Sequence, residues 1–427
     1  MRKRLTSISI VGSAALAACF GAGPAPQKSE ATVVFVAPTP TGDICNNSRY
    51  VSSLQIGSTT GYGLFMPFVP PNTSQCTNGP QGADIEVMSF DLDGNNPQGT
   101  MVEPAGNSIA ISPPFASNGS DVFWSANSQI SSVSSGTQML SPGGNGPNTF
   151  TVLSMAAGAG SIFLIGYSQF PGGYFPEPWD PQWPGNNMGG PGTGQGSAMF
   201  ATVPLPFGSG AVVPQQHGSA SSFYCDELKH CIVANPTDVY YMRRGDAASG
   251  YAAAIDDFDR TSKTIKQLDT IPFTLSQAAT PVGLIATPTH VAWAVAMNGQ
   301  QFNNVIPPGC WIYVHDVMNT ASGGNLIFQS GSFSCLDLAM DDSFIYFTII
   351  QSVQENDCGG CMQPIHGVGV GRVSLDGSTF ESIKLDIHGQ IYAGPRRVLL
   401  DGLTGTNLFL ADPLLVAKVP RDSLAGQ

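Results

Sequence analysis

Short apolar stretches that contain an aromatic residue recur along the chain, usually after a small, polar or acidic residue. Seven copies are present: Gly63-Leu64-Phe65, Asp121-Val122-Phe123-Trp124, Ser161-Ile162-Phe163-Leu164, Asp238-Val239-Tyr240-Tyr241, His290-Val291-Ala292-Trp293, Ser343-Phe344-Ile345-Tyr346-Phe347 and Asn407-Leu408-Phe409-Leu410. Each has the length and residue types of one β-strand, and no long helical period accompanies them. The pattern predicts a chain of repeated β units.

Further strand-like stretches flank these copies. A short apolar stretch precedes most of them, namely Ser108–Ile111, Cys231–Ala234, Gly283–Ala286, Leu336–Ala339 and Arg397–Leu400. A third stretch follows each copy, namely Ile85–Phe90, Ile130–Val133, Ala198–Val203, Ala253–Ile255, Trp311–His315, Val368–Val373 and Leu415–Val419. With an edge strand such as Ser382–Leu385, each unit becomes a four-stranded antiparallel sheet.

A small sheet with two apolar faces cannot bury both by itself, whereas stacking such sheets around an axis covers both. The copies follow one another at about 40 to 77 residues, a period typical of propeller blades. We therefore expect an all-β fold, a β-propeller of seven blades over residues 45–425. Six or eight blades and an array of two-sheet sandwiches are the alternatives. The repeats resemble the YWTD/NHL-type propellers of secreted bacterial proteins.

The first residues have the zones of a secretory signal. Arg2, Lys3 and Arg4 precede the apolar run from Leu5 to Ala18. As a helix this run spans about 21 Å, less than the roughly 30 Å that crossing a bilayer requires. It ends in Leu16-Ala17-Ala18-Cys19, which resembles the lipobox of bacterial lipoproteins.

The resemblance implies that residues 1–18 are removed and that lipid on Cys19 anchors the protein to a membrane, with residues 19–40 as a flexible tether. Position 20 is Phe rather than Asp, which by the sorting rule of such lipoproteins favours the outer membrane, on its periplasmic or cell-surface face. The alternative is an ordinary signal peptide in which Cys19 has no role.

Composition agrees with an exported β protein. The chain has 50 Gly and 33 Pro, 42% hydrophobic and 11% charged residues, which suits many short strands joined by loops. The formal net charge is −13, and the basic pairs Arg243-Arg244 and Arg396-Arg397 are its nearest approach to a basic cluster. Nucleic acid is therefore excluded as a partner, because phosphate binding needs clustered Lys and Arg. We expect a monomer.

Eight cysteines follow Cys19, and an even number in an exported chain favours disulfides. Pairing of neighbours, each within one repeat, is expected: Cys45–Cys76, Cys225–Cys231, Cys310–Cys335 and Cys358–Cys361. Cys358-Gly359-Gly360-Cys361 has the spacing of a redox or zinc motif, but it lies in a Gly-rich loop without the expected helix or second ligand pair. Structural disulfides are the preferred interpretation, and we expect no bound metal.

Several polar motifs have ordinary structural explanations. Asp91-Leu92-Asp93-Gly94 resembles the start of a calcium loop, but Asp376-Gly377 occupies the same place in another unit, where it indicates a hairpin turn. Asp256, Asp257 and Asp259 are expected in the equivalent turn. His315-Asp316 has the residue types of an acid/base pair, but neighbours on a strand point to opposite faces. No catalytic signature and no cofactor motif is found.

An insert over residues 166–196 does not follow the repeat. It carries aromatic residues among Pro and Gly, namely Tyr167, Phe170, Tyr174, Phe175, Trp179 and Trp183. Exposed aromatic side chains are typical binding anchors, and long loops are often functional. The insert is expected either to cover one propeller face or to bind a protein, peptide or glycan.

These observations predict a membrane-anchored lipoprotein whose propeller is a non-catalytic binding or scaffold module with a protein or glycan partner. One alternative is a lyase- or dehydrogenase-type enzyme that uses the central funnel. A charged or metal-binding cluster at one mouth of the channel would favour it. The other alternative is a structural component of the cell envelope.

Overall fold

A computed structural model describes most of the propeller. The described residues are 32–36, 49–57, 59–67, 85–96, 100–106, 114–126, 129–140, 149–169, 198–216, 231–244, 251–272, 279–297, 309–319, 323–331, 333–351, 366–384, 399–404, 406–412 and 415–424.

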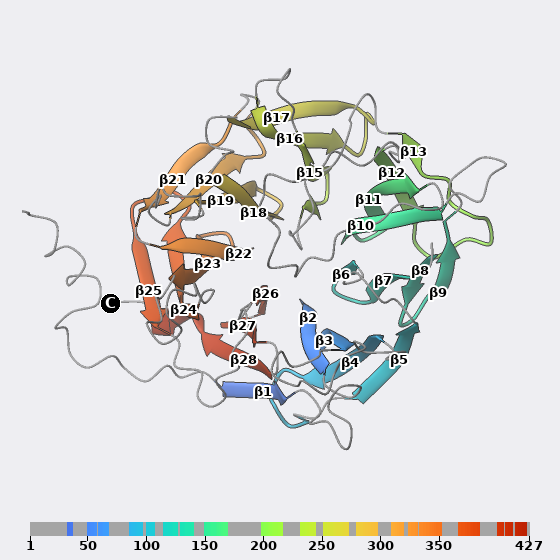
Figure 1. Ribbon diagram of the computed structural model, residues 1–427, viewed down its shortest axis with the longest axis horizontal. Coiled ribbons are helices and arrows are strands. Elements are labelled where there is room, and N and C mark those ends of the chain that lie inside the picture. The colour runs from blue at the N-terminus through green and yellow to red at the C-terminus, as the bar shows by residue number, and fades with distance from the viewer. Residues whose placement is uncertain are drawn as a thin grey trace, which may run out of the picture.

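Seven four-stranded antiparallel sheets form a ring, and we number them as blades in chain order (Figure 1). Within blades 1 to 6, the strands follow one another from the axis to the outside. Blades 1 to 3 contain β2 (Arg49–Ile56), β3 (Thr60–Pro67), β4 (Ile85–Asp91), β5 (Thr100–Gly106); β6 (Phe115–Ser117), β7 (Val122–Ala126), β8 (Gln129–Ser132), β9 (Gly136–Met139); β10 (Thr149–Ala157), β11 (Ser161–Gln169), β12 (Ala198–Pro204) and β13 (Gln215–Gln216).

The other blades have the same construction. They contain β14 (Ile232–Ala234), β15 (Asp238–Arg244), β16 (Tyr251–Asp259), β17 (Ile265–Pro272); β18 (Ala279–Ala286), β19 (His290–Met297), β20 (Gly309–Asp316), β21 (Asn325–Ser330); β22 (Ser334–Met340), β23 (Phe344–Gln351), β24 (His366–Ser374), β25 (Phe380–Lys384); and, in blade 7, β26 (Leu399–Thr404), β27 (Asn407–Asp412), β28 (Leu415–Pro420) and β1 (Thr32–Val36).

The predicted seven-bladed propeller is confirmed. All seven recurring apolar stretches fall in or overlap the second strand of a blade, and the stretches predicted to follow them coincide with the third strands. Four of the five predicted first strands overlap β14, β18, β22 and β26, and the predicted edge strand overlaps β25. The stretch Ser108–Ile111 lies outside the described residues.

The ring closes through both ends of the chain. β1 pairs antiparallel with β28, with Thr32 opposite Lys418 and Val36 opposite Leu415, so that the blue strand lies against the red one (Figure 1). The expected boundaries were therefore wrong here: residues 32–36, expected in the tether 19–40, are the outer strand of blade 7, and the propeller begins before residue 45. The strand Thr-Val-Val-Phe-Val has the residue types of a strand but lacks the repeat that marks the blades.

The two faces of the ring differ in their connections. On one face, which we call the turn face, tight turns join the first strand of a blade to the second. The amide that begins each turn donates to the carbonyl three residues later: Gly57 to Thr60, Asn118 to Asp121, Gly158 to Ser161, Asn235 to Asp238, Thr287 to His290 and Asp341 to Phe344. The third strands also end on this face.

The opposite face, which we call the loop face, carries the connections from second to third strands and from one blade to the next. Several of these connections are long: in blade 3 the second strand ends at Gln169 and the third begins at Ala198, and in blade 6 the corresponding residues are Gln351 and His366. The long sequence insertions therefore enter and leave the ring on this face.

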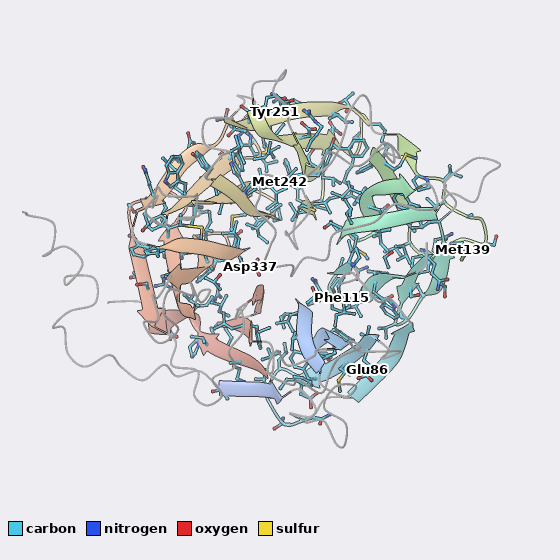
Figure 2. All side chains as sticks on the ribbon, viewed as in Figure 1. Glu86, Phe115, Met139, Met242, Tyr251 and Asp337 are labelled. Atoms are coloured by element: carbon cyan, nitrogen blue, oxygen red, sulfur yellow. A yellow bond between two sulfur atoms is a disulfide. The ribbon has the colours of Figure 1, made fainter. Side chains whose placement is uncertain are left out.

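The core lies between neighbouring blades, where side chains fill the space between the sheets (Figure 2). One continuous cluster joins Phe163 of blade 3, Tyr241 of blade 4 and Trp293 of blade 5, all buried. Each sheet thus buries apolar side chains on both faces, as the repeat predicts. In the described part of the chain, no helix has both the length and the apolar character needed to cross a membrane.

Candidate functional site

The innermost strands are interrupted at one level of the ring. Pairing with the second strand shifts by one extra residue in five of them: β2 after Val51, β10 after Val152, β18 after Pro281, β22 after Cys335 and β26 after Leu400. Such bulges bend a strand and redirect its side chains. The wall of the ring is therefore irregular at this level.

The position four residues before each tight turn lies at this level. It holds small residues in most blades: Ser53 in blade 1, Ser154 in blade 3, Cys231 in blade 4 and Gly283 in blade 5. In blade 6 the corresponding residue is Asp337, a carboxylate that is only 5% exposed. This replacement makes Asp337 the candidate functional residue of the inner wall.

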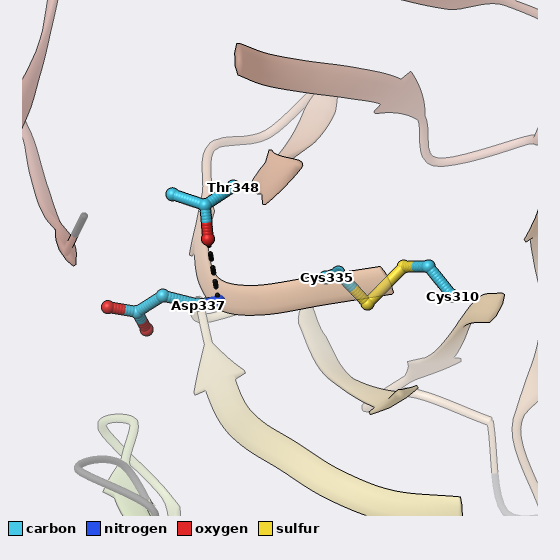
Figure 3. Close-up of a disulfide and its surroundings, with 4 residues drawn as sticks. All are labelled: Cys310, Cys335, Asp337 and Thr348. Atoms are coloured by element: carbon cyan, nitrogen blue, oxygen red, sulfur yellow. Dashed lines mark hydrogen bonds between the residues drawn. A yellow bond between two sulfur atoms is a disulfide. The ribbon is translucent and has the colours of Figure 1, made fainter. Parts of the chain in front are cut away.

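Asp337 is held by the bulge of β22, where Leu336 and Asp337 together oppose Thr348 of β23. Its amide donates to Thr348 Oγ1 at 3.1 Å, and its carboxylate Oδ1 accepts from the amide of Leu338 at 2.9 Å. The side chain lies toward the centre of the ring (Figure 2) and extends away from Thr348 (Figure 3). An ionised carboxylate in this place can accept hydrogen bonds or attract a cationic group.

Sequence reasoning did not single out Asp337. It placed Leu336–Ala339 in a first strand, and the signal was present there, because Asp337 is a charged residue between two leucines of a strand expected to be buried. A charge at such a position calls for hydrogen-bond partners. The bulge that brings the Asp337 amide to Thr348 does not follow from the apolar pattern.

The disulfide expected between Cys310 and Cys335 is present, with their Cα atoms 5.3 Å apart (Figure 3). The expectation that it would tie one repeat was wrong: Cys310 is in β20 of blade 5 and Cys335 in β22 of blade 6, so the bond joins neighbouring blades. Both residues are fully or almost fully buried. Cys335 is on the same strand as Asp337, two residues away.

Cys231 is also disulfide-bonded. The other cysteines for which disulfides were predicted, and the predicted lipidation site, lie outside the described residues; they are Cys19, Cys45, Cys76, Cys225, Cys358 and Cys361.

The aromatic insert begins later than expected. Tyr167, predicted in a binding loop, lies in β11 opposite Thr151 and Ala198, because the second strand of blade 3 continues to Gln169. The other predicted binding residues, Phe170, Tyr174, Phe175, Trp179 and Trp183, lie outside the described residues.

The turn interpretation of the Asp-Gly motifs is confirmed. The amide of Gly94 donates to the carbonyl of Asp91, and that of Gly377 to Ser374, and both glycines have positive φ angles, of 78° and 71°. Such angles favour glycine over residues with a Cβ. These carboxylates therefore belong to hairpins of the turn face.

The equivalent placement of Asp256 and Asp257 was wrong, since both lie within β16. Asp259, at the end of the strand, does accept from the amides of Thr261 and Ser262 in the turn. Asp256 is buried and forms an ion pair with Arg243, Nε to Oδ2 at 2.7 Å. The Tyr251 hydroxyl accepts from the same guanidinium at 2.8 Å. This pair fixes the second and third strands of blade 4.

The carboxylate of Asp257 has fewer hydrogen-bond partners than that of Asp256. Its Oδ1 is buried without a hydrogen-bond partner. Burial, together with the nearby carboxylates of Asp238 and Asp259, raises its pKa to about 6, and Lys266 opposes the change. The group is therefore partly protonated in mildly acidic solution.

The pKa of Asp121 in blade 2 changes in the opposite direction. Burial acts to raise its pKa, but the hydroxyls of Ser132, Ser134 and Ser135 and the amide of Val122 donate to it and lower the pKa below its usual value. The carboxylate cross-links the turn that joins β8 and β9 to the start of β7. Its role is structural.

His315 and Asp316 point apart. His315 is buried, with Nδ1 2.9 Å from the carbonyl oxygen of Gly323, whereas Asp316 is exposed and accepts from the amide of Met318. They are not arranged as an acid/base pair. Within the described ranges, no three His, Cys, Asp or Glu side chains are gathered so as to hold a metal ion.

No protein-family model matches the chain, and no curated protein matches it. Among solved structures, it is similar to the WD40 domain of Pan2 from Neurospora crassa, with a TM-score of 0.50 and 11% identity, covering 93% of this chain and 98% of that domain. It also matches an acylaminoacyl peptidase from Pyrococcus horikoshii, with a TM-score of 0.48 and 10% identity, covering 87% of this chain and 52% of that one.

This chain thus spans about half the length of the peptidase. At such low identity, the likeness to the Pan2 domain concerns the propeller fold alone.

Proposed function

We propose that this protein is an exported lipoprotein, anchored through lipid on Cys19 to the outer membrane, and that its propeller is a non-catalytic module that binds a protein or glycan. The anchor rests on the lipobox-like Leu16-Ala17-Ala18-Cys19 behind a basic and apolar leader. The resemblance of the repeats to YWTD/NHL-type propellers of secreted proteins agrees with this location.

The observation that supports binding most strongly is the difference between the two faces. The tight turns occupy one face, whereas the chain between Gln169 and Ala198, with its five aromatic residues, leaves and rejoins the ring on the other. Variable loops on a rigid scaffold are where proteins usually place recognition residues. We therefore assign the partner to the loop face.

The anchor is tested by cell fractionation. Cys19→Ser should move the protein from the membrane fraction to the soluble fraction. A variant that stays with the membranes contradicts the anchor.

The binding face is tested by crosslinking in cells, followed by purification and mass spectrometry. Deletion of residues 170–192 should remove partners that the wild-type chain retains, while thermal unfolding shows that the ring is intact. Gly160→Ser, in the exposed tight turn of the same blade on the turn face, is the control and should retain them. Partners retained by the deletion variant would contradict binding through the insert.

A further inference from the structure

The direction of β1 relates the ring to the proposed anchor. First and third strands of a blade run from the loop face to the turn face, so β28, the third strand of blade 7, ends on the turn face. β1 is antiparallel to β28, and Thr32 is opposite Lys418 near that end. The chain therefore enters the ring at the turn face, and β1 runs from there toward the loop face.

Contacts around the end of β28 place it at the same face. The Lys418 ammonium donates to the carbonyl of Leu92, in the turn that follows β4, at 3.0 Å. The 3-10 helix η2 (Arg421–Leu424) follows β28, and the amide of Arg421 donates to Thr406 in the turn of blade 7. The Arg421 guanidinium pairs with Asp341 in the turn of blade 6.

We infer that the turn face is turned toward the membrane and that the loop face is directed away from it, where a partner can reach it. This inference rests on the proposed anchor at Cys19. The thirteen residues from Cys19 to Thr32 reach at most about 45 Å when fully extended. For the loop face to meet the bilayer, the tether would first have to pass the height of blade 7, about 20 Å for its six-residue strands.

A second observation agrees with this orientation. Apart from Met139, at the loop-face end of β9, and Val213, the large exposed apolar side chains of the described residues lie at the turn-face ends of the third and fourth strands around the ring: Val133, Ile265, Met318, Leu326 and Phe380. Spread over blades 2, 4, 5 and 6, they form a rim that a flat surface can meet at several points. Apolar side chains are favoured at the boundary between headgroups and acyl chains.

The charges on this face determine the kind of surface it fits. Asp93, Asp259, Asp376 and other turn carboxylates are acidic, and Arg260 and Lys263 offset them in part. An acidic face is repelled by anionic lipid. The surface to which it fits is a zwitterionic bilayer.

Two glycines offer matched probe positions for a test. Gly160 is exposed in the tight turn of blade 3, on the turn face, and Gly331 is exposed between β21 and β22, on the loop face. A Cβ added at either position meets no atom within 4 Å. Gly160→Cys and Gly331→Cys can therefore each carry a fluorescent donor with little disturbance of the ring.

The experiment uses the full lipidated chain, purified from membranes and reconstituted in phosphatidylcholine vesicles that carry an acceptor dye on their headgroups. Energy transfer should be more efficient from position 160 than from position 331. If the protein floats with the vesicles but transfer is equal, or is more efficient from position 331, the orientation is overturned and the anchor stands. If lipidated wild-type protein does not float with them, the anchor fails, and the orientation fails with it.

Discussion

Thr348 Oγ1 accepts a hydrogen bond from the backbone amide of Asp337, and this contact holds the bulge in the innermost strand of blade 6. The two residues lie on neighbouring strands, and Thr348 is 1% exposed, so water cannot readily replace the hydroxyl. Asp337 and Thr348 thus form a polar pair at a level of the ring where most other blades have small residues.

Thr348→Val should destabilise the protein, because it leaves the buried amide of Asp337 without its acceptor at a typical cost of about 1–3 kcal/mol. The side chain keeps nearly the same shape, so the loss reports the hydrogen bond. Hydrogen exchange of the Asp337 amide should become faster in this variant. Thr348→Ser, which keeps the hydroxyl, should retain its protection, and equal exchange in both variants would contradict the role of Oγ1.

The bond between Cys310 and Cys335 should stabilise the contact between blades 5 and 6. It closes a sequence separation of 25 residues. A loop of this size corresponds to about 3.5 kcal/mol of unfolding free energy, through restriction of the unfolded chain. Replacing both cysteines by alanine should lower the free energy of unfolding by this amount, which is measured as a lower midpoint of urea unfolding. A double variant with an unchanged midpoint would show that the bond contributes no stability.

Gly324 should not tolerate a larger residue. A Cβ there would lie 2.3 Å from the Trp293 ring and 3.2 Å from Tyr313 Cβ, and the Trp293 and Tyr313 rings are stacked on one another in the core. Gly324→Ala should therefore cost about 1–3 kcal/mol through overpacking. Gly331→Ala, which meets open space, is the matched control. Thermal unfolding of the two variants side by side measures the difference.

Asp257 should make stability depend on pH. Its pKa is raised from 3.8 to about 6 in the folded chain, so between these values the folded state holds a proton that the unfolded state has released. The free energy of unfolding therefore falls as pH rises through this window, and the cost remains above it.

Asp257→Asn should remove this dependence and stabilise the protein at pH 7 by about 1 kcal/mol, less than the full pKa shift implies because the carboxyl is partly exposed. Urea unfolding at pH 4, 5, 6 and 7 measures it. Asp259→Asn, whose carboxylate has a pKa lowered by the turn amides of Ser262 and Thr261, should have the opposite effect at pH 7. The same pH dependence in wild type and Asp257→Asn would exclude Asp257 as its source.

The repeat predicted the ring because each second strand carries its own apolar and aromatic signature, such as Phe123-Trp124 or Tyr240-Tyr241, which is strong whatever the neighbouring loops do. The strand Thr32–Val36 was missed because its place depends on a partner at the other end of the chain. Local pattern contains no information about that partner.

The sites were harder to predict than the fold. The pairing of Cys310 with Cys335 followed from adjacency in sequence, but its place between blades depends on which strands are neighbours in space. Asp256 and Asp257 were expected in a turn because aspartates are common there, yet β16 continues through them and Arg243 compensates the buried charge of Asp256. Tertiary partners determined these outcomes.

The pairing of β1 with β28 also imposes an order in time. A chain is synthesised from its N-terminus, so Thr32 exists long before Lys418, and contacts between such distant residues form slowly. Until the last strand is made, blade 7 lacks the partner that holds β1, and the ring stays open. Closure of the ring therefore has to wait until Leu415–Pro420 has been made, and loss of that strand would leave β1 and β27 without their shared partner.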